Sequence, residues 1–123
     1  MLIASACCLA AALAIGVVLA AAYLRAEGRF PPLWLGAIHG AFALSGLGIL
    51  GIALATTSPR GQATGSASFG AIAFVALAVA AAFGLRVFTA HLRRKHLPGT
   101  ALGVHAMLAV TGFVFLFVYA LQS

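Results

Sequence analysis

Four long apolar runs divide this chain into segments that match the thickness of a lipid bilayer. The runs cover residues 2–24, 33–55, 69–90 and 101–121, and among them only the third holds a charged side chain, Arg86. About 20 apolar residues in a helix cross about 30 Å of hydrocarbon. A spanning helix also satisfies its own backbone hydrogen bonds, which bilayer hydrocarbon cannot do. The sequence therefore predicts an all-α, four-helix transmembrane bundle with up-down-up-down topology.

The composition supports a membrane protein built as one unit. Of the 123 residues, 64% are hydrophobic, and the mean hydropathy is +1.17, whereas a soluble domain of this size needs a polar shell. Only short connections separate the runs, so we expect residues 1–123 to form a single integral membrane domain. The first run lacks the basic region of a signal peptide and is interpreted as a retained helix. Cys7 and Cys8 lie in that run and are expected to be small, buried hydrophobic residues.

Positive charge predicts the orientation of the bundle. The first and third connections, with the end of the third run, carry Arg25, Glu27, Arg29, Arg86, Arg93, Arg94 and Lys95. The second connection carries Arg60 alone, and short loops rich in Lys and Arg stay in the cytoplasm. We therefore expect a bacterial inner (cytoplasmic) membrane protein with both termini outside and with Tyr119 in the outer aromatic belt. The net charge of +6 is interpreted as facing anionic lipid headgroups, and no nucleic acid is expected.

The second and fourth runs share a spaced pattern that includes one histidine in each. A shift of 66 residues superposes Pro32, His39, Ala43, Gly46 and Leu50 on Pro98, His105, Ala109, Gly112 and Leu116. These matches form one stripe of a helix. The preceding runs align poorly at this shift, so the pattern is compatible with a tandem repeat of two helical hairpins without establishing it. Because the second and fourth helices of such a bundle lie diagonally opposite, the two histidines should face each other at one depth, in the cytoplasmic half.

An ionisable side chain inside a membrane is costly, which favours a functional role for the histidine pair. Three interpretations stay open. The imidazoles could serve helix packing alone, or bind zinc or copper, although no Asp, Glu or Met shares the stripe to complete such a site. A b-type haem needs only two axial imidazoles, and the small residues beside them leave room for its flat ring. Those residues are Ala43, Gly46, Ala109 and Gly112, of which the glycines also suit close helix packing.

Cations near the inner end supply candidates for the haem propionates. We favour Arg86, because it lies inside an apolar run and needs a partner, although snorkelling to the headgroups explains its position equally well. Arg25 is a secondary candidate for this role, and His91 is a secondary candidate for an axial position. The sequence thus predicts one haem b per chain, with His39 and His105 as ligands of the haem iron and no catalytic residue.

The layout resembles the four-helix membrane cytochromes b, a class that includes cytochrome b561-like proteins and the haem-bearing membrane anchors of respiratory enzymes. The resemblance covers all four runs, and its specific part is His39 and His105 on their Pro-x6-His segments. Cytochrome b561-like proteins usually have two histidine pairs, one near each membrane face. This chain has one pair, so the resemblance does not imply electron transfer across the whole membrane.

The resulting hypothesis is a membrane electron-transfer protein rather than a stand-alone enzyme, with a quinone or a larger redox complex as its partner in the lipid bilayer. The alternative is a non-catalytic accessory or structural subunit of a larger membrane complex, respiratory or photosynthetic, because abundant Gly and Ala suit close packing. A transporter ranks last, since no acidic residue lies within a predicted span. The oligomeric state is left open.

Overall fold

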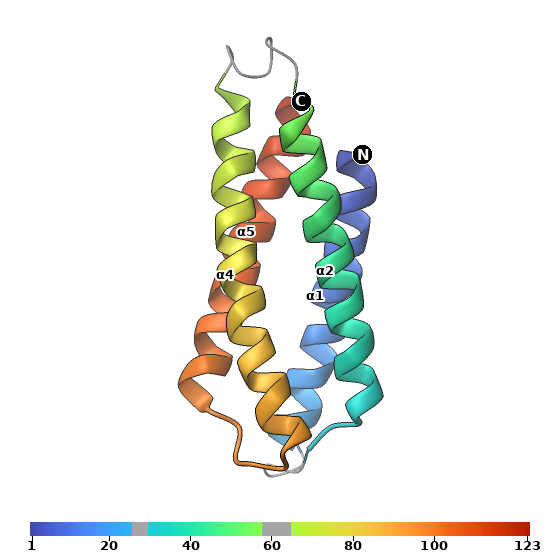
Figure 1. Cartoon of the computed structure of the whole chain (residues 1–123), viewed down its shortest axis with the longest axis vertical. Helices are drawn as coiled ribbons and strands as arrows, with labels where there is room; N and C mark the ends of the chain where they lie inside the picture. The colour runs from blue at the N-terminus through green and yellow to red at the C-terminus, as the bar shows by residue number, and fades with distance from the viewer. Residues whose placement is uncertain (26–29, 58–64) are drawn as a thin grey trace.

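The computed structural model describes residues 1–25, 30–57 and 65–123. Its helices are α1 (Leu2–Arg25), α2 (Leu33–Ala55), α4 (Ser66–Leu92) and α5 (Gly99–Gln122). They run alternately up and down, and both chain termini lie at the same end of the bundle (Figure 1). All four helices are long and apolar enough to cross a membrane. The predicted all-α bundle is confirmed, and the chain has the architecture of a multi-pass membrane protein with four candidate spans.

The helix boundaries lie close to the ends of the apolar runs. α2 matches its predicted range, and α1 and α5 differ from theirs by one or two residues at an end. α4 differs most, because it begins at Ser66 rather than at Phe69 and ends at Leu92. Ser66 and Ser68 form part of its first turn, where serine side chains are well tolerated because they can hydrogen-bond the free backbone groups. Hydropathy alone therefore predicts this helix too short.

At the end of the bundle opposite the termini, a proline precedes each of two helices, and a residue with left-handed backbone conformation follows a third. Pro32 and Pro98 are the N-cap residues of α2 and α5, and proline suits a helix start because its missing N–H would have no partner there. After α4, Lys95 N–H donates to the Ala90 carbonyl and Arg94 N–H to the His91 carbonyl. With Arg94 at φ 50°, these two bonds form a Schellman motif that ends the helix.

The bundle consists of two hairpins that face each other. Neighbouring helices are α1 and α2, α2 and α4, α4 and α5, and α5 and α1. Within the described residues, α2 and α5 are therefore diagonal partners, as predicted for the second and fourth helices. Contacts are denser inside the first hairpin (α1 and α2) and the second hairpin (α4 and α5) than between the hairpins. This arrangement determines where a cavity can open.

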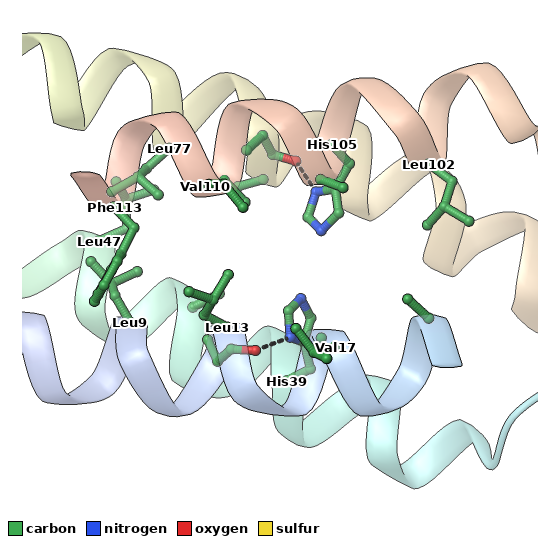
Figure 2. Close-up of a pocket in the computed structure, with 18 residues that line it drawn as sticks. Leu9, Leu13, Val17, His39, Leu47, Leu77, Leu102, His105, Val110 and Phe113 are labelled. Carbon is green, nitrogen blue, oxygen red and sulfur yellow. Dashed lines mark hydrogen bonds between the residues drawn. The ribbon is translucent and has the colours of Figure 1, made fainter. Parts of the chain in front are cut away.

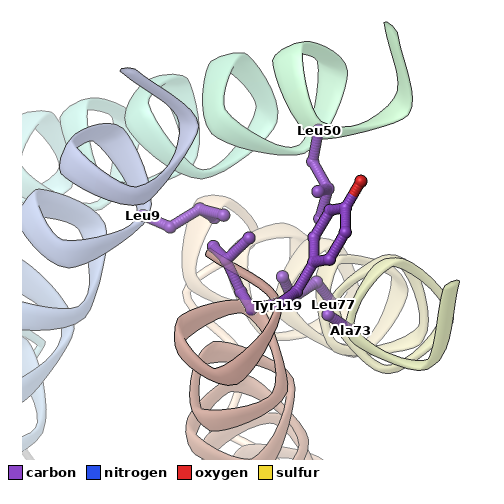
Figure 3. Packing of buried hydrophobic residues seen from close by; sticks show 6 residues of the cluster. Leu9, Leu50, Ala73, Leu77 and Tyr119 are labelled. Carbon is purple, nitrogen blue, oxygen red and sulfur yellow. The ribbon is translucent and has the colours of Figure 1, made fainter. Parts of the chain in front are cut away.

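The hydrophobic core lies toward the end that holds the termini. Its buried side chains come from all four helices and pack against one another (Figure 3): Leu9, Leu50, Ala73, Leu77, Leu116 and Tyr119. Tyr119 is only 3% exposed, and its hydroxyl hydrogen-bonds Thr57 Oγ1 at 3.1 Å. The prediction that Tyr119 belongs to an aromatic belt is therefore wrong. The ring points inward because Tyr119 shares a helix face with the buried Gly112 and Leu116.

The outer surface of the bundle is apolar and includes one of the two cysteines. Cys7 is exposed, Cys8 is partly buried, and both are free. The expectation that both are buried is wrong, because the buried face of α1 is formed by Ser5, Leu9 and Ala12, which leaves Cys7 on the opposite side. Large apolar side chains such as Leu44 and Leu85 are also more than 60% exposed, as expected for a surface that contacts lipid.

The charged residues used to predict orientation are only partly described. Glu27, Arg29 and Arg60 lie outside the described residues. Arg25, Arg93, Arg94 and Lys95 are exposed at the end of the bundle opposite the termini, where α1 and α4 finish. The type of membrane and the side that the termini face stay predictions.

Candidate functional site

The two membrane histidines meet near the centre of the bundle. His39 on α2 and His105 on α5 have ring centroids 5.9 Å apart, with their planes inclined by 76°. Each is the seventh residue of its helix, so both lie about 9 Å from the helix start at 1.5 Å per residue. Figure 2 shows the two rings directed toward each other across the space between the hairpins. The facing arrangement at a common depth that the sequence predicts is thus observed.

A backbone carbonyl from the same hairpin orients each ring. His39 Nδ1 lies 2.8 Å from the Ala12 carbonyl oxygen on α1, and His105 Nδ1 lies 2.7 Å from the Ala80 carbonyl oxygen on α4. A carbonyl can only accept, so Nδ1–H is the donor and the neutral ring keeps its lone pair on Nε2. In Figure 2 this second nitrogen lies at the tip of each ring and points toward the opposite imidazole. Two nitrogen lone pairs therefore converge from opposite sides.

One glycine on the first helix of each hairpin lies directly against an imidazole. A Cβ atom on Gly16 would lie 3.0 Å from His39 Cε1, and one on Gly84 would lie 2.8 Å from His105 Cε1. Gly16 and Gly84 each follow the accepting carbonyl by four residues, which is one helical turn. The ring edge therefore rests on the helix backbone itself, at positions where any other residue would place a side chain.

Gly46 and Gly112 accommodate leucine side chains rather than a ligand. A Cβ on Gly46 would lie 2.6 Å from Leu9 Cγ, and one on Gly112 would lie 2.7 Å from Leu77 Cγ. Both glycines are buried. The room that the sequence led us to expect beside these two glycines for a macrocycle is thus filled by leucine from the same hairpin.

A cavity of about 180 Å³ adjoins the two histidines and is open on part of its boundary. Residues of all four helices line it, including Ala43 and Ala109 at the positions that the sequence indicated. Apart from His39 and His105, every lining residue is apolar, and many are small (Figure 2). The site therefore offers two nitrogen ligands in surroundings that suit a largely apolar molecule.

The remaining predicted residues are not brought to this cavity. Arg86 is exposed and does not line it. His91 stacks on Phe30, with ring centroids 5.1 Å apart and planes within 15°, and Arg25 is exposed at the end of α1. The structure thus brings together His39, His105, Ala43 and Ala109, but leaves Arg86, Arg25 and His91 away from the cavity lining.

Sequence reasoning missed the residues of α1 and α4 that hold the histidines. Leu9, Ala12 and Gly16 correspond to Leu77, Ala80 and Gly84, and each of these pairs is separated by 68 residues rather than 66. At the shift of 68, eight of 17 positions are identical between residues 9–25 and 77–93. A search that allowed the two helices of a hairpin different shifts would have found them. The tandem repeat itself stays a prediction.

Comparisons with protein-family models, with curated proteins and with solved structures found no match to this chain. Within the described residues, no group of three or more His, Cys, Asp or Glu side chains gathers as a metal site. The features of the described residues that bear on function are the paired imidazoles, their hydrogen bonds and the cavity beside them.

Proposed function

We propose that the protein is a membrane electron-transfer protein that binds one b-type haem between His39 and His105. The observation that carries this proposal is the convergence of two imidazoles whose Nδ1 atoms are already bonded to carbonyls. Each ring thereby presents an unprotonated Nε2, which is the form that binds a metal. Haem supplies four equatorial nitrogens of its own and requires only two axial ligands from the protein.

The separation of the rings fits an axial pair. A histidine–metal–histidine axis measures about 6 Å between ring centres, from two bonds of about 2 Å between metal and nitrogen and about 1 Å from each nitrogen to its ring centre. The observed distance between the ring centroids is 5.9 Å. Direct packing of the two rings would also give this value, so the distance supports the proposal together with the cavity and the tautomers, not alone.

The volume of the cavity is large enough for only part of a macrocycle. Its volume of about 180 Å³ lies below the roughly 300 Å³ at which small-molecule pockets usually begin. The cavity is, however, open on part of its boundary and lies between hairpins that contact each other less densely than their own helices do. A bound haem would therefore require the two hairpins to move apart, with His39 and His105 as the residues that would hold it.

When bound, a bis-histidyl haem supplies one-electron ferric and ferrous chemistry. The residues of this chain would bind and orient it: His39 and His105 hold the axis, the Ala12 and Ala80 carbonyls fix the rings, and Ala43 and Ala109 leave space beside them. The apolar lining excludes water from the site. A single haem at this depth does not reach both membrane faces, so the proposal includes a quinone or a larger redox complex as electron partner.

The test is the visible spectrum of the protein purified in detergent after expression with adequate haem. The expected result is a pair of sharp bands on reduction, at a haem-to-chain ratio of one. His39→Ala and His105→Ala should each abolish this spectrum, and Ala109→Leu should weaken haem binding by filling the cavity without touching a ligand. His96→Ala is the matched control, because His96 is exposed, bonds the Leu97 carbonyl and does not line the cavity that the described residues form.

Two outcomes would contradict the proposal. If the spectrum persists in His105→Ala and is lost in His91→Ala, the haem has a different axial pair. If the wild-type protein is colourless, takes up no haem and co-purifies with a larger complex at a fixed ratio, the accessory-subunit alternative is favoured instead.

A further inference from the structure

We propose that Gly16 and Gly84 are positioning residues that fix the orientation and the tautomer of the two histidines. The inference deepens the proposed function and rests on it, because it assigns these glycines the task of aiming each Nε2 at a common ligand. Gly16 lines the cavity and Gly84 does not, and we assign both a role that acts through the imidazole that rests on them.

Each imidazole fits closely against the first helix of its hairpin. Each imidazole has to approach a carbonyl that already belongs to a helix, and the ring edge then lies over the residue one turn further along. That residue is Gly16 for His39 and Gly84 for His105, with ideal Cβ positions 3.0 and 2.8 Å from the two Cε1 atoms. Carbon atoms pack at about 3.5–4.0 Å, so a methyl group at either position would push the ring away.

The surroundings of each imidazole limit the direction in which the ring can move. His39 is held on one side by α1 and faces His105 at a centroid distance of 5.9 Å on the other. A ring displaced from Gly16 or Gly84 lengthens its bond to the carbonyl, now 2.8 Å for His39 and 2.7 Å for His105. Hydrogen bonds of this kind weaken steeply as the distance and the angle depart from their optimum. The proton is then no longer confined to Nδ1.

The register of the two helices in each hairpin brings the carbonyl and the ring together. In the first hairpin, Leu9 packs on Gly46 while Gly16 receives His39. Leu9 and Gly16 are seven residues apart on α1, as are His39 and Gly46 on α2. Seven residues are two helical turns, so both contacts lie on one face of each helix. The same pair of contacts recurs in the second hairpin between Leu77 and Gly112 and between Gly84 and His105.

Each hairpin thus contains a complete half-site, by which we mean one histidine, the carbonyl that accepts its proton and the glycine that admits its ring. Groups that hydrogen-bond a metal-ligating histidine fix its orientation and raise its basicity, and their loss typically lowers metal affinity 10- to 100-fold. Substitution of Gly84 should act in this way although residue 84 contacts no ligand.

The experiment compares Gly84→Ala and Gly16→Ala with two control glycines, Gly40→Ala and Gly103→Ala. A Cβ at either control position meets no atom within 4 Å. The first readout is ¹⁵N NMR of the histidine rings in haem-free protein, assigned with His39→Ala and His105→Ala. We expect the wild type and both controls to show Nδ1-protonated, neutral rings for His39 and His105. Gly84→Ala should change the His105 signal alone, and Gly16→Ala should change the His39 signal alone.

The second readout is haem affinity by titration, with the midpoint potential measured on the loaded protein. We expect Gly84→Ala to bind about 10- to 100-fold more weakly, Gly16→Ala to show a smaller loss because its contact is longer, and the controls to match the wild type. The midpoint potential of the glycine variants should be more positive, because a less basic imidazole stabilises ferric iron less. If Gly84→Ala does not give a monodisperse helical protein, Gly16→Ala carries the comparison.

The two proposals fail in different ways. If the wild type binds haem and both Gly→Ala variants retain its ring signals and affinity, the positioning inference is overturned and the proposed function stands. If the Gly→Ala variants alter the ring signals as expected but neither they nor the wild type binds haem, the glycines do orient the histidines and the haem proposal is overturned.

Discussion

The two ends of the bundle differ in how their interiors are filled. Toward the termini, Leu50 and Leu116 are fully buried, with 0% exposure, in a core that includes Tyr119. In the other half, the same two helices present His39 and His105 beside a cavity of about 180 Å³. Well-packed interiors leave few voids larger than a water molecule. The packed half thus holds the four helices together, while the open half contains the cavity beside the two histidines.

The largest expected effect comes from filling the open half. With haem at 100 times its dissociation constant, linkage predicts that the folded protein gains about 2.7 kcal/mol. We expect this gain in wild type and none in His39→Ala, as measured by thermal unfolding in detergent at graded haem concentrations. An equal gain in His39→Ala would show that haem stabilises the protein from another place and would remove the contrast between the two halves.

The second-largest effect on stability should come from a substitution in the packed half. Leu116→Ala leaves a cavity in the packed core. Truncation of a buried leucine typically lowers the free energy of unfolding by about 2–5 kcal/mol. We expect about 2 kcal/mol, at the low end, because lipid tails are as apolar as leucine and the loss is mainly one of packing. Unfolding measurements on Leu116→Ala and on the lipid-facing control Val114→Ala, whose side chain is 55% exposed, test this. Similar losses in both variants would contradict a special role for the core.

A smaller effect is expected at the edge of the packed half. Tyr119→Phe removes the hydroxyl that bonds Thr57 Oγ1, while Thr57 keeps its bond to the Ala53 carbonyl. Because no buried group is left unpaired, the loss should be near the net value of one hydrogen bond, about 1 kcal/mol. Chemical unfolding of Tyr119→Phe, Thr57→Val and the double variant should give losses that fall short of additivity by about 1 kcal/mol, because each single change already removes the shared bond. Thr57→Val also removes the bond to the Ala53 carbonyl. Additive losses would indicate that the two hydroxyls act independently.

The smallest effect should follow Ser5→Ala. The Ser5 hydroxyl is fully buried and donates to the Gly46 carbonyl at 2.8 Å. Interhelical hydrogen bonds in membranes average about 0.6 kcal/mol, and the Gly46 carbonyl lies inside a helix, where it can keep its backbone partner. The same unfolding assay should therefore detect a loss at the limit of its precision, with haem affinity unchanged. A large drop in haem affinity would mean that the two halves are strongly coupled.

The sequence carries the fold more completely than the site. Apolar length alone places α2 at its observed ends, and the shared spacing of His39 and His105 correctly brings the rings together across the diagonal. Gly46 and Gly112 were misleading. A small residue on an inward helix face indicates close packing, but it does not identify the group that packs against it. Only the contact with Leu9 or Leu77 distinguishes a ligand from a neighbouring helix.

Gly16 and Gly84 were missed for a different reason. Their match appears only when the first helices of the two hairpins are shifted by 68 residues, and alanine-rich sequence hides such matches among chance identities. Arg86 illustrates a third limit, since its position in an apolar run gives its depth but not the direction of its side chain. In the structure that side chain is exposed, away from the cavity lining.

The carbonyl bonds within each hairpin also bear on how such a chain enters a bilayer during its synthesis. A bare imidazole N–H in hydrocarbon is costly, since an unsatisfied polar group there costs several kcal/mol. Because His39 reaches the Ala12 carbonyl on the preceding helix, that cost can be offset as soon as α1 and α2 have entered the bilayer, before α4 and α5 follow. The second hairpin can follow in the same way, and the two finished halves then need only to meet sideways in the lipid.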